Sequence, residues 1–199
     1  MKIYCIGDSL TEGDYGIKGK RCIPNVKPEN YPYFLHKITG EKVINLGISG
    51  ARPSTYLPLF NRYDFSDANY VIFLLGTNGG LDEETQTKDN DAYVYMIKSL
   101  IANVKNGKII LCTPPHATID EKMSNYGYRG QVKKSAKFIR KVASEFNLYL
   151  LDLDDSDVFN DENEKIMQPN DGLHFGRKGY EKLAEIIYLL LKNNFKEFR

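Results

Sequence analysis

Five short apolar runs divide the chain, and polar or helix-like stretches separate them. "YVIFLL" at 70–75 and "KIILC" at 108–112 are almost continuously apolar, which is typical of strands that are covered on both faces. We predict strands over 2–6, 42–46, 70–75, 108–112 and 148–152.

Apolar positions between and after these runs recur at the spacing of amphipathic helices. The three sets are Tyr93, Met96, Ile97, Leu100, Ile101 and Val104; Val132, Ala136, Ile139, Ala143 and Phe146; and Leu183, Ile186, Ile187, Leu190 and Leu191. Strands that alternate with helices indicate a three-layer α/β/α sandwich around a parallel sheet. No internal repeat or linker is visible, so we expect one domain over 1–199.

Polar and glycine-containing segments follow the predicted strands. Gly7-Asp8-Ser9 follows the first, "NLGISGAR" (45–52) the second and "GTNGG" (76–80) the third, and "NDGLHFGRKGY" (170–180) comes after the last. Because the carboxyl ends of parallel strands share one edge of the sheet, we expect these segments to converge there.

The polar residues at this edge fit nucleophilic catalysis. A serine hydroxyl such as Ser9 needs an adjacent base, which His174 can supply, and Asp171 lies near enough in sequence to orient the imidazole. The N–H groups of Ser9 and Gly50 and the side-chain amide of Asn78 are candidates for an oxyanion hole.

Each of these residues also has a purely structural interpretation. Gly-Asp-Ser and Asn78-Gly79 are common in turns, Gly50 can relieve backbone crowding, and Asp171 can cap a turn or helix. Two other functions compete with the hydrolase. A flavodoxin-like module could bind a phosphate or nucleotide with the amides of 7–13, and a metal-dependent hydrolase could use Asp8, Asp171 and His174.

The ordered blocks "IGDSLTEG", "NLGISG", "LLGTNGG" and "DGLHFGRKGY" resemble those of the SGNH hydrolases, also called GDSL esterases or lipases. The resemblance implies a flavodoxin-like fold with a five-stranded parallel sheet in the order 2-1-3-4-5. It also implies cofactor-free and metal-free hydrolysis of carboxylic esters or thioesters through an acyl-enzyme. Ser9 matches the family's nucleophile, Gly50 and Asn78 match its oxyanion donors, and Asp171 and His174 match its acid and base.

One block departs from the family's pattern. The third block usually reads Gly-x-Asn-Asp, whereas Gly79 follows Asn78 in this chain. The departure puts the bracing of that loop in doubt, and Asp82 lies near enough in sequence to substitute. We expect Asp8 to brace the loop that carries the nucleophile.

Two irregular segments, 14–30 and 113–130, are expected to shape the substrate pocket, because long loops of this kind are often functional. Their tyrosines would suit stacking on a sugar ring, so we expect short acyl esters, such as acetyl esters, of a carbohydrate or small alcohol. His36 is interpreted as a structural or surface residue. The candidate substrate contacts are Tyr15, Arg52, His116, Tyr126 and Tyr128.

Composition narrows the alternatives. The chain has 27 basic and 26 acidic residues and a formal net charge of +1, which gives no reason to expect nucleic acid as a partner. No run reaches the roughly 20 apolar residues of a membrane span. The chain opens directly on a predicted strand, so we expect a cytoplasmic protein without a signal peptide, although a secreted protein after signal removal gives the same sequence.

Cysteines and acidic residues offer no separate site. Cys5, Cys22 and Cys112 are too scattered for a disulfide framework or a zinc site, and we expect Cys5 and Cys112 to be buried in strands. The acidic stretch "DLDDSDVFNDENE" (152–164) lacks the glycine and the final glutamate of a calcium loop, and we expect a solvated loop.

Overall fold

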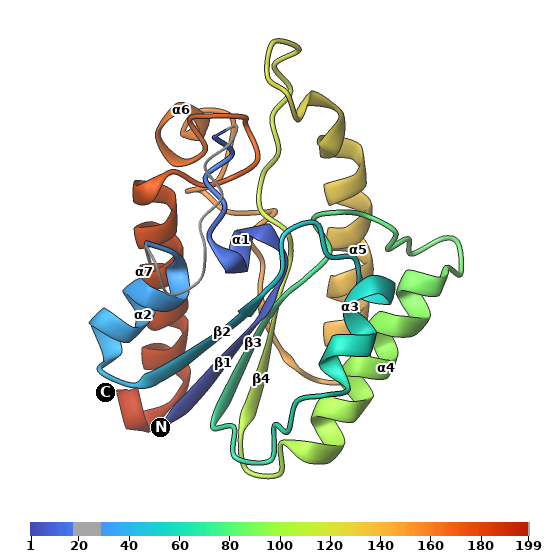
Figure 1. The fold of residues 1–199 in the computed structure, drawn as a ribbon, viewed down its shortest axis with the longest axis vertical. Helices are drawn as coiled ribbons and strands as arrows, with labels where there is room; N and C mark the ends of the chain where they lie inside the picture. Colours follow the sequence, from blue (N-terminus) through green and yellow to red (C-terminus); the bar gives the residue numbers. More distant parts are fainter. Residues whose placement is uncertain (18–28, 199) are drawn as a thin grey trace.

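A parallel sheet forms the centre of the computed structural model, which describes residues 1–17 and 29–198 (Figure 1). The strands are β1 (Lys2–Gly7), β2 (Lys42–Gly47), β3 (Tyr70–Leu74), β4 (Lys108–Cys112) and β5 (Tyr149–Leu151). Their order in the sheet is β2-β1-β3-β4-β5, with all neighbours parallel. This order confirms the expected flavodoxin-like α/β sandwich, and the strand ends differ from the predicted ones by one residue at most.

Helices cover both faces of the sheet. α3 (Pro53–Phe60), α4 (Lys88–Asn103) and α5 (Arg129–Glu145) pack on one face, and α2 (Tyr31–Thr39) and α7 (Arg177–Asn194) pack on the other (Figure 1). The shorter elements are α1 (Ser9–Glu12), α6 (Glu164–Met167) and the 3₁₀ turns η1 (Tyr126–Tyr128) and η2 (Lys196–Phe198).

Side chains alternate across β1, as expected for a strand between two layers. Tyr4 and Ile6 join the core under α3, α4 and α5, whereas Ile3 and Cys5 join the core under α2 and α7. Burial on both faces explains why the strands read as nearly continuous apolar runs.

The cysteines in the strands are buried, as predicted. Cys5 and Cys112 are fully buried, and burial raises the pKa of Cys5 to about 12, so its thiol stays protonated and unreactive at neutral pH. Cys22 lies outside the described residues, as do the lysines at 18, 20 and 27 of the segment 14–30.

The acidic segment 152–164 differs from the solvated loop that we expected. Arg140 of α5 donates to Asp152 at 2.6 Å and to Asp154 at 2.8 Å, and Lys133 lies 2.7 Å from Asp154. Glu164 is only 8% exposed. Cations of α5 therefore hold part of this segment against the protein, a pairing that local charge density does not reveal.

Two further observations bear on the expectations from sequence. His36 lies exposed on α2, and its Nδ1 is 2.7 Å from the Glu41 carbonyl, which agrees with a surface role. Across the described parts of the chain, every helix is too short or too polar to traverse a bilayer.

Candidate active site

A tight turn at the end of β1 presents Ser9. A side chain at Gly7 would place its Cβ 2.1 Å from the Thr11 hydroxyl and 2.3 Å from the Leu74 carbonyl, so only glycine fits there. Asp8 then caps α1, because its Oδ1 accepts the Leu10 N–H at 3.1 Å. Ser9 opens α1 at the carboxyl end of a central strand.

The loop before α7 brings Asp171 and His174 to Ser9. His174 Nε2 lies 2.8 Å from Ser9 Oγ, and His174 Nδ1 lies 2.7 Å from Asp171 Oδ2. The Leu173 and His174 N–H groups donate to Asp171 Oδ1 at 3.0 and 2.8 Å. With the Nδ1 hydrogen directed at the carboxylate, the Nε2 lone pair faces the serine hydroxyl.

Electrostatics favour an ionised Asp171 and a strongly basic His174. Burial alone would lower the pKa of His174, but the hydrogen bond and charge of Asp171 outweigh burial and raise it above its ordinary 6.5. Burial alone would raise the pKa of Asp171, but hydrogen bonds from His174 and the backbone lower it below its ordinary 3.8. Asp171 is therefore ionised at neutral pH, and it makes His174 a stronger base than a free imidazole.

The segment around Tyr15 and Gly16 covers Asp171 from outside. A Cβ on Gly16, whose φ is +67°, would lie 2.2 Å from Asp171 Oδ2, so the glycine backbone rests on the carboxylate. The Tyr15 carbonyl accepts a hydrogen bond from Asn170 at 2.8 Å, and the Tyr15 hydroxyl donates to the Glu29 carbonyl at 2.6 Å. The Tyr15–Gly16 backbone therefore helps to enclose Asp171, and a substrate contact by the Tyr15 ring stays a prediction.

Gly50 and Asn78 lie in the loops that follow β2 and β3. The Asn78 side-chain amide donates to the Ala51 carbonyl at 2.9 Å, which ties the two loops together and leaves its second hydrogen for another acceptor. Ser49 N–H donates to Glu12 Oε2 at 2.8 Å, which ties the β2 loop to α1. Gly50 has a φ of +76°, and a Cβ there would meet nothing within 4 Å. The conformation, rather than crowding, therefore requires glycine at this position.

Gln131 of α5 braces the β3 loop. Its Nε2 donates to the Thr77 carbonyl at 2.7 Å, while Asp8 Oδ2 accepts the Thr77 N–H at 3.3 Å. A Cβ on Gly79 would lie 2.3 Å from the Gln131 side chain, so an aspartate at position 79 would clash with Gln131. Asp82, suggested from sequence as the substitute, accepts the Glu84 N–H at 3.0 Å and pairs with Lys134 at 3.0 Å, so it braces a later part of this loop than Thr77.

Of the other expected substrate contacts, His116 is the clearest correction. It is 5% exposed, and its ring nitrogens face Glu164 and Arg129 at 2.7 and 2.8 Å, so it cannot meet a substrate without losing these bonds. Arg52 is the N-cap residue of α3 and pairs with the buried Asp89 at 2.5 Å, as a structural residue would.

The two tyrosines of η1 differ from each other. Tyr128 packs on a small apolar cluster of Ala117, Val132 and Leu173. Leu173 directly precedes His174 in the chain. Tyr126 is 46% exposed, and its hydroxyl lies 3.4 Å from Glu121. A substrate contact by either tyrosine stays a prediction.

Four residues of the site region were missed by sequence reasoning: Glu12, Gln131, Glu164 and Gln168. Only Glu12 carried a local signal, because it lies within the "GDSLTEG" block. Gln131 and Glu164 act on partners about 50 residues away, and Gln168 lies just before the Asp171 block but is defined by its bond to the distant His116 carbonyl, so no local pattern marked these three.

Comparison with known proteins identifies the family of the chain. Residues 5–182 match the model of the GDSL-like Lipase/Acylhydrolase family. A curated acetylxylan esterase from Xylanibacter ruminicola is 28% identical over 96% of this chain, which spans 43% of that relative's length.

Solved structures share the fold along their whole length. A lipase/acylhydrolase from Enterococcus faecalis superposes with a TM-score of 0.74 at 23% identity, covering 98% of this chain and 97% of that one. The acetyl xylan esterase AlAXEase gives a TM-score of 0.72 at 21% identity, covering 96% of this chain and 100% of that one. With its family model matched over most of its length, the chain belongs to the GDSL-like lipase/acylhydrolase family.

Proposed function

We propose that this protein is a carboxylic ester hydrolase that uses Ser9 as its nucleophile. One observation carries the proposal: the Ser9 hydroxyl lies 2.8 Å from an imidazole nitrogen whose opposite nitrogen is bound to a carboxylate at 2.7 Å. Membership of an acylhydrolase family supports the same reaction class.

The geometry suggests the following acylation step. The Ser9 oxygen attacks the ester carbonyl as His174 Nε2 accepts the hydroxyl proton, and Asp171 stabilises the imidazolium that forms. Negative charge on the carbonyl oxygen would be met by the Ser9 N–H, the Gly50 N–H and the free hydrogen of Asn78. The tetrahedral intermediate then expels the alcohol, which leaves with the proton from His174, and the acyl group remains on Ser9.

Deacylation repeats these roles with water as the nucleophile. His174 accepts a proton from the water, the water oxygen forms a bond to the acyl carbon, and the bond to Ser9 Oγ breaks. Ser9 recovers its hydrogen from His174, and the carboxylic acid departs. No group beyond this chain and water is needed for the proton balance.

As substrate class we propose short acyl esters, acetyl esters in particular, of a carbohydrate or small alcohol. Two relatives bear names that specify acetylated xylan, which supports a carbohydrate acetyl ester. Tyr126, exposed on η1, offers an aromatic surface of the kind that stacks on sugar rings.

The arrangement of the carboxylates favours this function over the two alternatives. A phosphate at the start of α1 would meet the Asp8 carboxylate, which already accepts the Leu10 N–H. A metal held by Asp8, Asp171 and His174 would compete with the N–H donors that both carboxylates bind through each of their oxygens.

A hydrolysis screen tests the proposal. The wild-type protein should cleave p-nitrophenyl acetate faster than longer acyl esters and should release acetate from acetylated xylan or acetylated monosaccharides. Ser9→Ala should fold normally and cleave none of them. Equal cleavage by Ser9→Ala would refute the nucleophile, and a preference for long acyl chains would refute the substrate class.

A further inference from the structure

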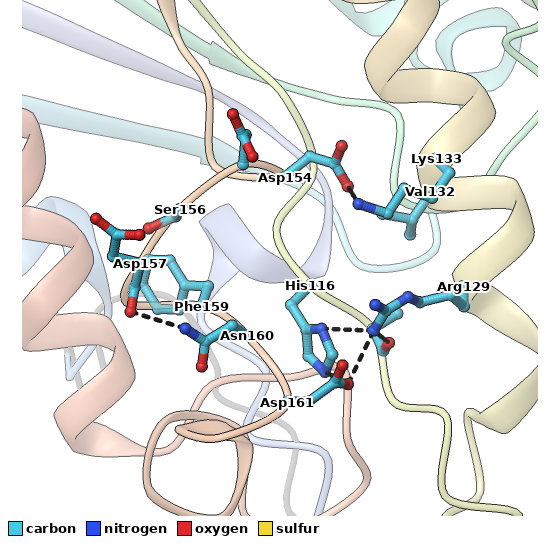
Figure 2. A pocket seen from close by; sticks show the side chains of 12 residues that line it. His116, Arg129, Val132, Lys133, Asp154, Ser156, Asp157, Phe159, Asn160 and Asp161 are labelled. Carbon is cyan, nitrogen blue, oxygen red and sulfur yellow. Dashed lines mark hydrogen bonds and ion pairs between the residues drawn. The ribbon is translucent and has the colours of Figure 1, made fainter.

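A second buried imidazole–carboxylate pair lies at the same edge of the sheet. His116, after β4, and Glu164, at the start of α6, are 5% and 8% exposed, with His116 Nε2 2.7 Å from Glu164 Oε2. Arg129 Nη1 contacts His116 Nδ1 at 2.8 Å (Figure 2). Because a guanidinium can only donate, Nδ1 is the acceptor and the ring hydrogen sits on Nε2, directed at Glu164.

The same residues could be read as a metal site, and the arginine argues against it. Among the described residues, one ligand atom each from His116, Asp161 and Glu164 lies within 4.8 Å of the others. A histidine that binds metal through Nε2 usually donates its Nδ1 hydrogen to an acceptor. Here Nδ1 faces Arg129, which also lies 3.0 Å from Asp161 (Figure 2). The guanidinium therefore lies where a metal-binding histidine would have a hydrogen-bond acceptor, and its positive charge would repel a metal cation.

Thr118 links Glu164 to the loop between Asp171 and His174. The Thr118 hydroxyl donates to Glu164 Oε1 at 2.9 Å, and the Thr118 N–H donates to the Gly172 carbonyl at 2.8 Å. Gly172 has a φ of +73°, and a Cβ there would lie 2.4 Å from Thr118 Cβ. The threonine therefore packs directly on the backbone that joins the acid to the base.

Gln168 provides a second link to the same loop. Its Nε2 donates to the His116 carbonyl at 2.6 Å and to the Leu173 carbonyl at 2.8 Å. Only an amide NH₂ can serve two carbonyls, so the orientation of this fully buried side chain is fixed. The carbonyls of both residues between Asp171 and His174, Gly172 and Leu173, are thus held by the segment 116–118 or by Gln168.

We propose that Glu164 is a positioning residue that keeps Asp171 and His174 aligned with Ser9. It fixes His116 and Thr118, whose backbone atoms bind Gln168 and Gly172, and it touches no reacting group itself. The proposal rests on the proposed function of the Ser9 site. It deepens that function, since a displacement of about 1 Å in a catalytic group can lower turnover about 10²-fold.

The test begins with two variants of Glu164. Glu164→Ala leaves the His116 and Thr118 donors without their acceptor, and we expect kcat for p-nitrophenyl acetate to fall about tenfold to a hundredfold while KM changes less than about twofold. Glu164→Gln should recover most of kcat, because its amide oxygen still accepts from His116 and its NH₂ can donate to the Thr118 hydroxyl.

Two buried threonines give a matched control. Thr118 and Thr113 are both fully buried and both donate a hydroxyl hydrogen to a carboxylate at 2.9 Å, but Thr113 pairs with Asp152, away from the loop of His174. Thr118→Val should lower kcat, whereas Thr113→Val should leave kcat unchanged per folded molecule. If Glu164→Ala does not fold, Thr118→Val and Glu164→Gln carry the test.

A proton NMR readout separates this proposal from the proposed function. The His174 Nδ1 hydrogen, bound to Asp171, should give a far-downfield signal that disappears or shifts in Glu164→Ala and Thr118→Val and stays unchanged in Thr113→Val. Loss of all ester cleavage in the wild-type protein would defeat the proposed function and leave this readout valid. Folded Glu164→Ala and Thr118→Val proteins with wild-type kcat and an unchanged signal would overturn the positioning role.

Discussion

His116 is buried and His174 is partly buried, each beside a carboxylate at 2.7 Å, and they differ in what faces the other ring nitrogen. His174 donates from Nδ1 to Asp171 and presents Nε2 to the Ser9 hydroxyl at 2.8 Å. His116 donates from Nε2 to Glu164, and its Nδ1 lone pair accepts a hydrogen bond from Arg129 at 2.8 Å.

The difference shows that an imidazole–carboxylate pair does not by itself make a general base. A base needs an unshared lone pair that faces a group with a proton to lose. His174 has one, because its partner is a hydroxyl. At His116 a donor-only guanidinium occupies that position, so the same pair of functional groups becomes part of the support for the loop.

Removing the hydroxyl or the base should have the largest effect. In Ser9→Ala and His174→Ala we expect turnover of p-nitrophenyl acetate to fall by about 10⁶-fold, since nucleophile and base act as one unit. The corresponding His116→Ala variant should lose far less. Stopped assays on freshly purified proteins with matched circular dichroism spectra would measure this, and comparable losses for the two histidines would contradict the contrast.

Replacing the orienting carboxylate should have the next largest effect. Asp171→Asn removes the acceptor that fixes the His174 tautomer, and we expect kcat to fall by about 10⁴-fold. Steady-state kinetics at several pH values would measure the loss. A fall of less than about tenfold would show that Asp171 does not orient the base.

The pH profile should report the same pair. Protonated His174 cannot accept the Ser9 proton, so kcat/KM of the wild-type protein should fall as the pH drops through the raised pKa of His174, above 6.5. Asp171 raises this pKa, so removing its charge should lower it. The acid-side fall in the residual kcat/KM of Asp171→Asn should therefore occur at lower pH than in the wild-type protein. An acid limb at the same pH in both proteins would assign the titration to another group.

The oxyanion donors should have an intermediate effect. Asn78→Ala removes the amide hydrogen that we assign to the developing negative charge, and we expect kcat to fall about 10²- to 10³-fold with a small change in KM. Asn78→Asp keeps the shape and has no N–H to donate, so it should not restore activity. Recovery of kcat in Asn78→Asp would contradict this role.

Arg52 should have the smallest effect on catalysis. Arg52→Met leaves the buried Asp89 carboxylate without its cationic partner, and we expect a loss of about 1–3 kcal/mol in the free energy of unfolding. Chemical denaturation would measure it. The KM values for neutral and anionic esters should both stay within about twofold, and a selective rise for the anionic ester would restore the substrate contact expected from sequence.

The sequence predicted the parts of the molecule that local pattern determines. Strand order followed from the resemblance, and Ser9, Asp171 and His174 were found because each lies in a short block at a strand end or before the last helix. The role of His116 was not visible, because its partner Glu164 lies 48 residues away in a segment that reads as a solvated acidic loop.

The bracing of the β3 loop was hidden for the same reason. Sequence proximity suggested Asp82, but the side chain that meets Thr77 is Gln131 of α5, 54 residues after Thr77 in the chain. Such contacts depend on how α5 packs against the sheet edge, and one sequence carries no pattern for that packing.

Labelling with a fluorophosphonate tests the central claim most directly. The Ser9 oxygen should displace fluoride and form one phosphonyl adduct per chain, which peptide mass spectrometry would place on Ser9. Labelling should be absent in Ser9→Ala and strongly slowed in His174→Ala, and it should proceed in His116→Ala. An adduct on another residue, or labelling that does not depend on His174, would contradict the account.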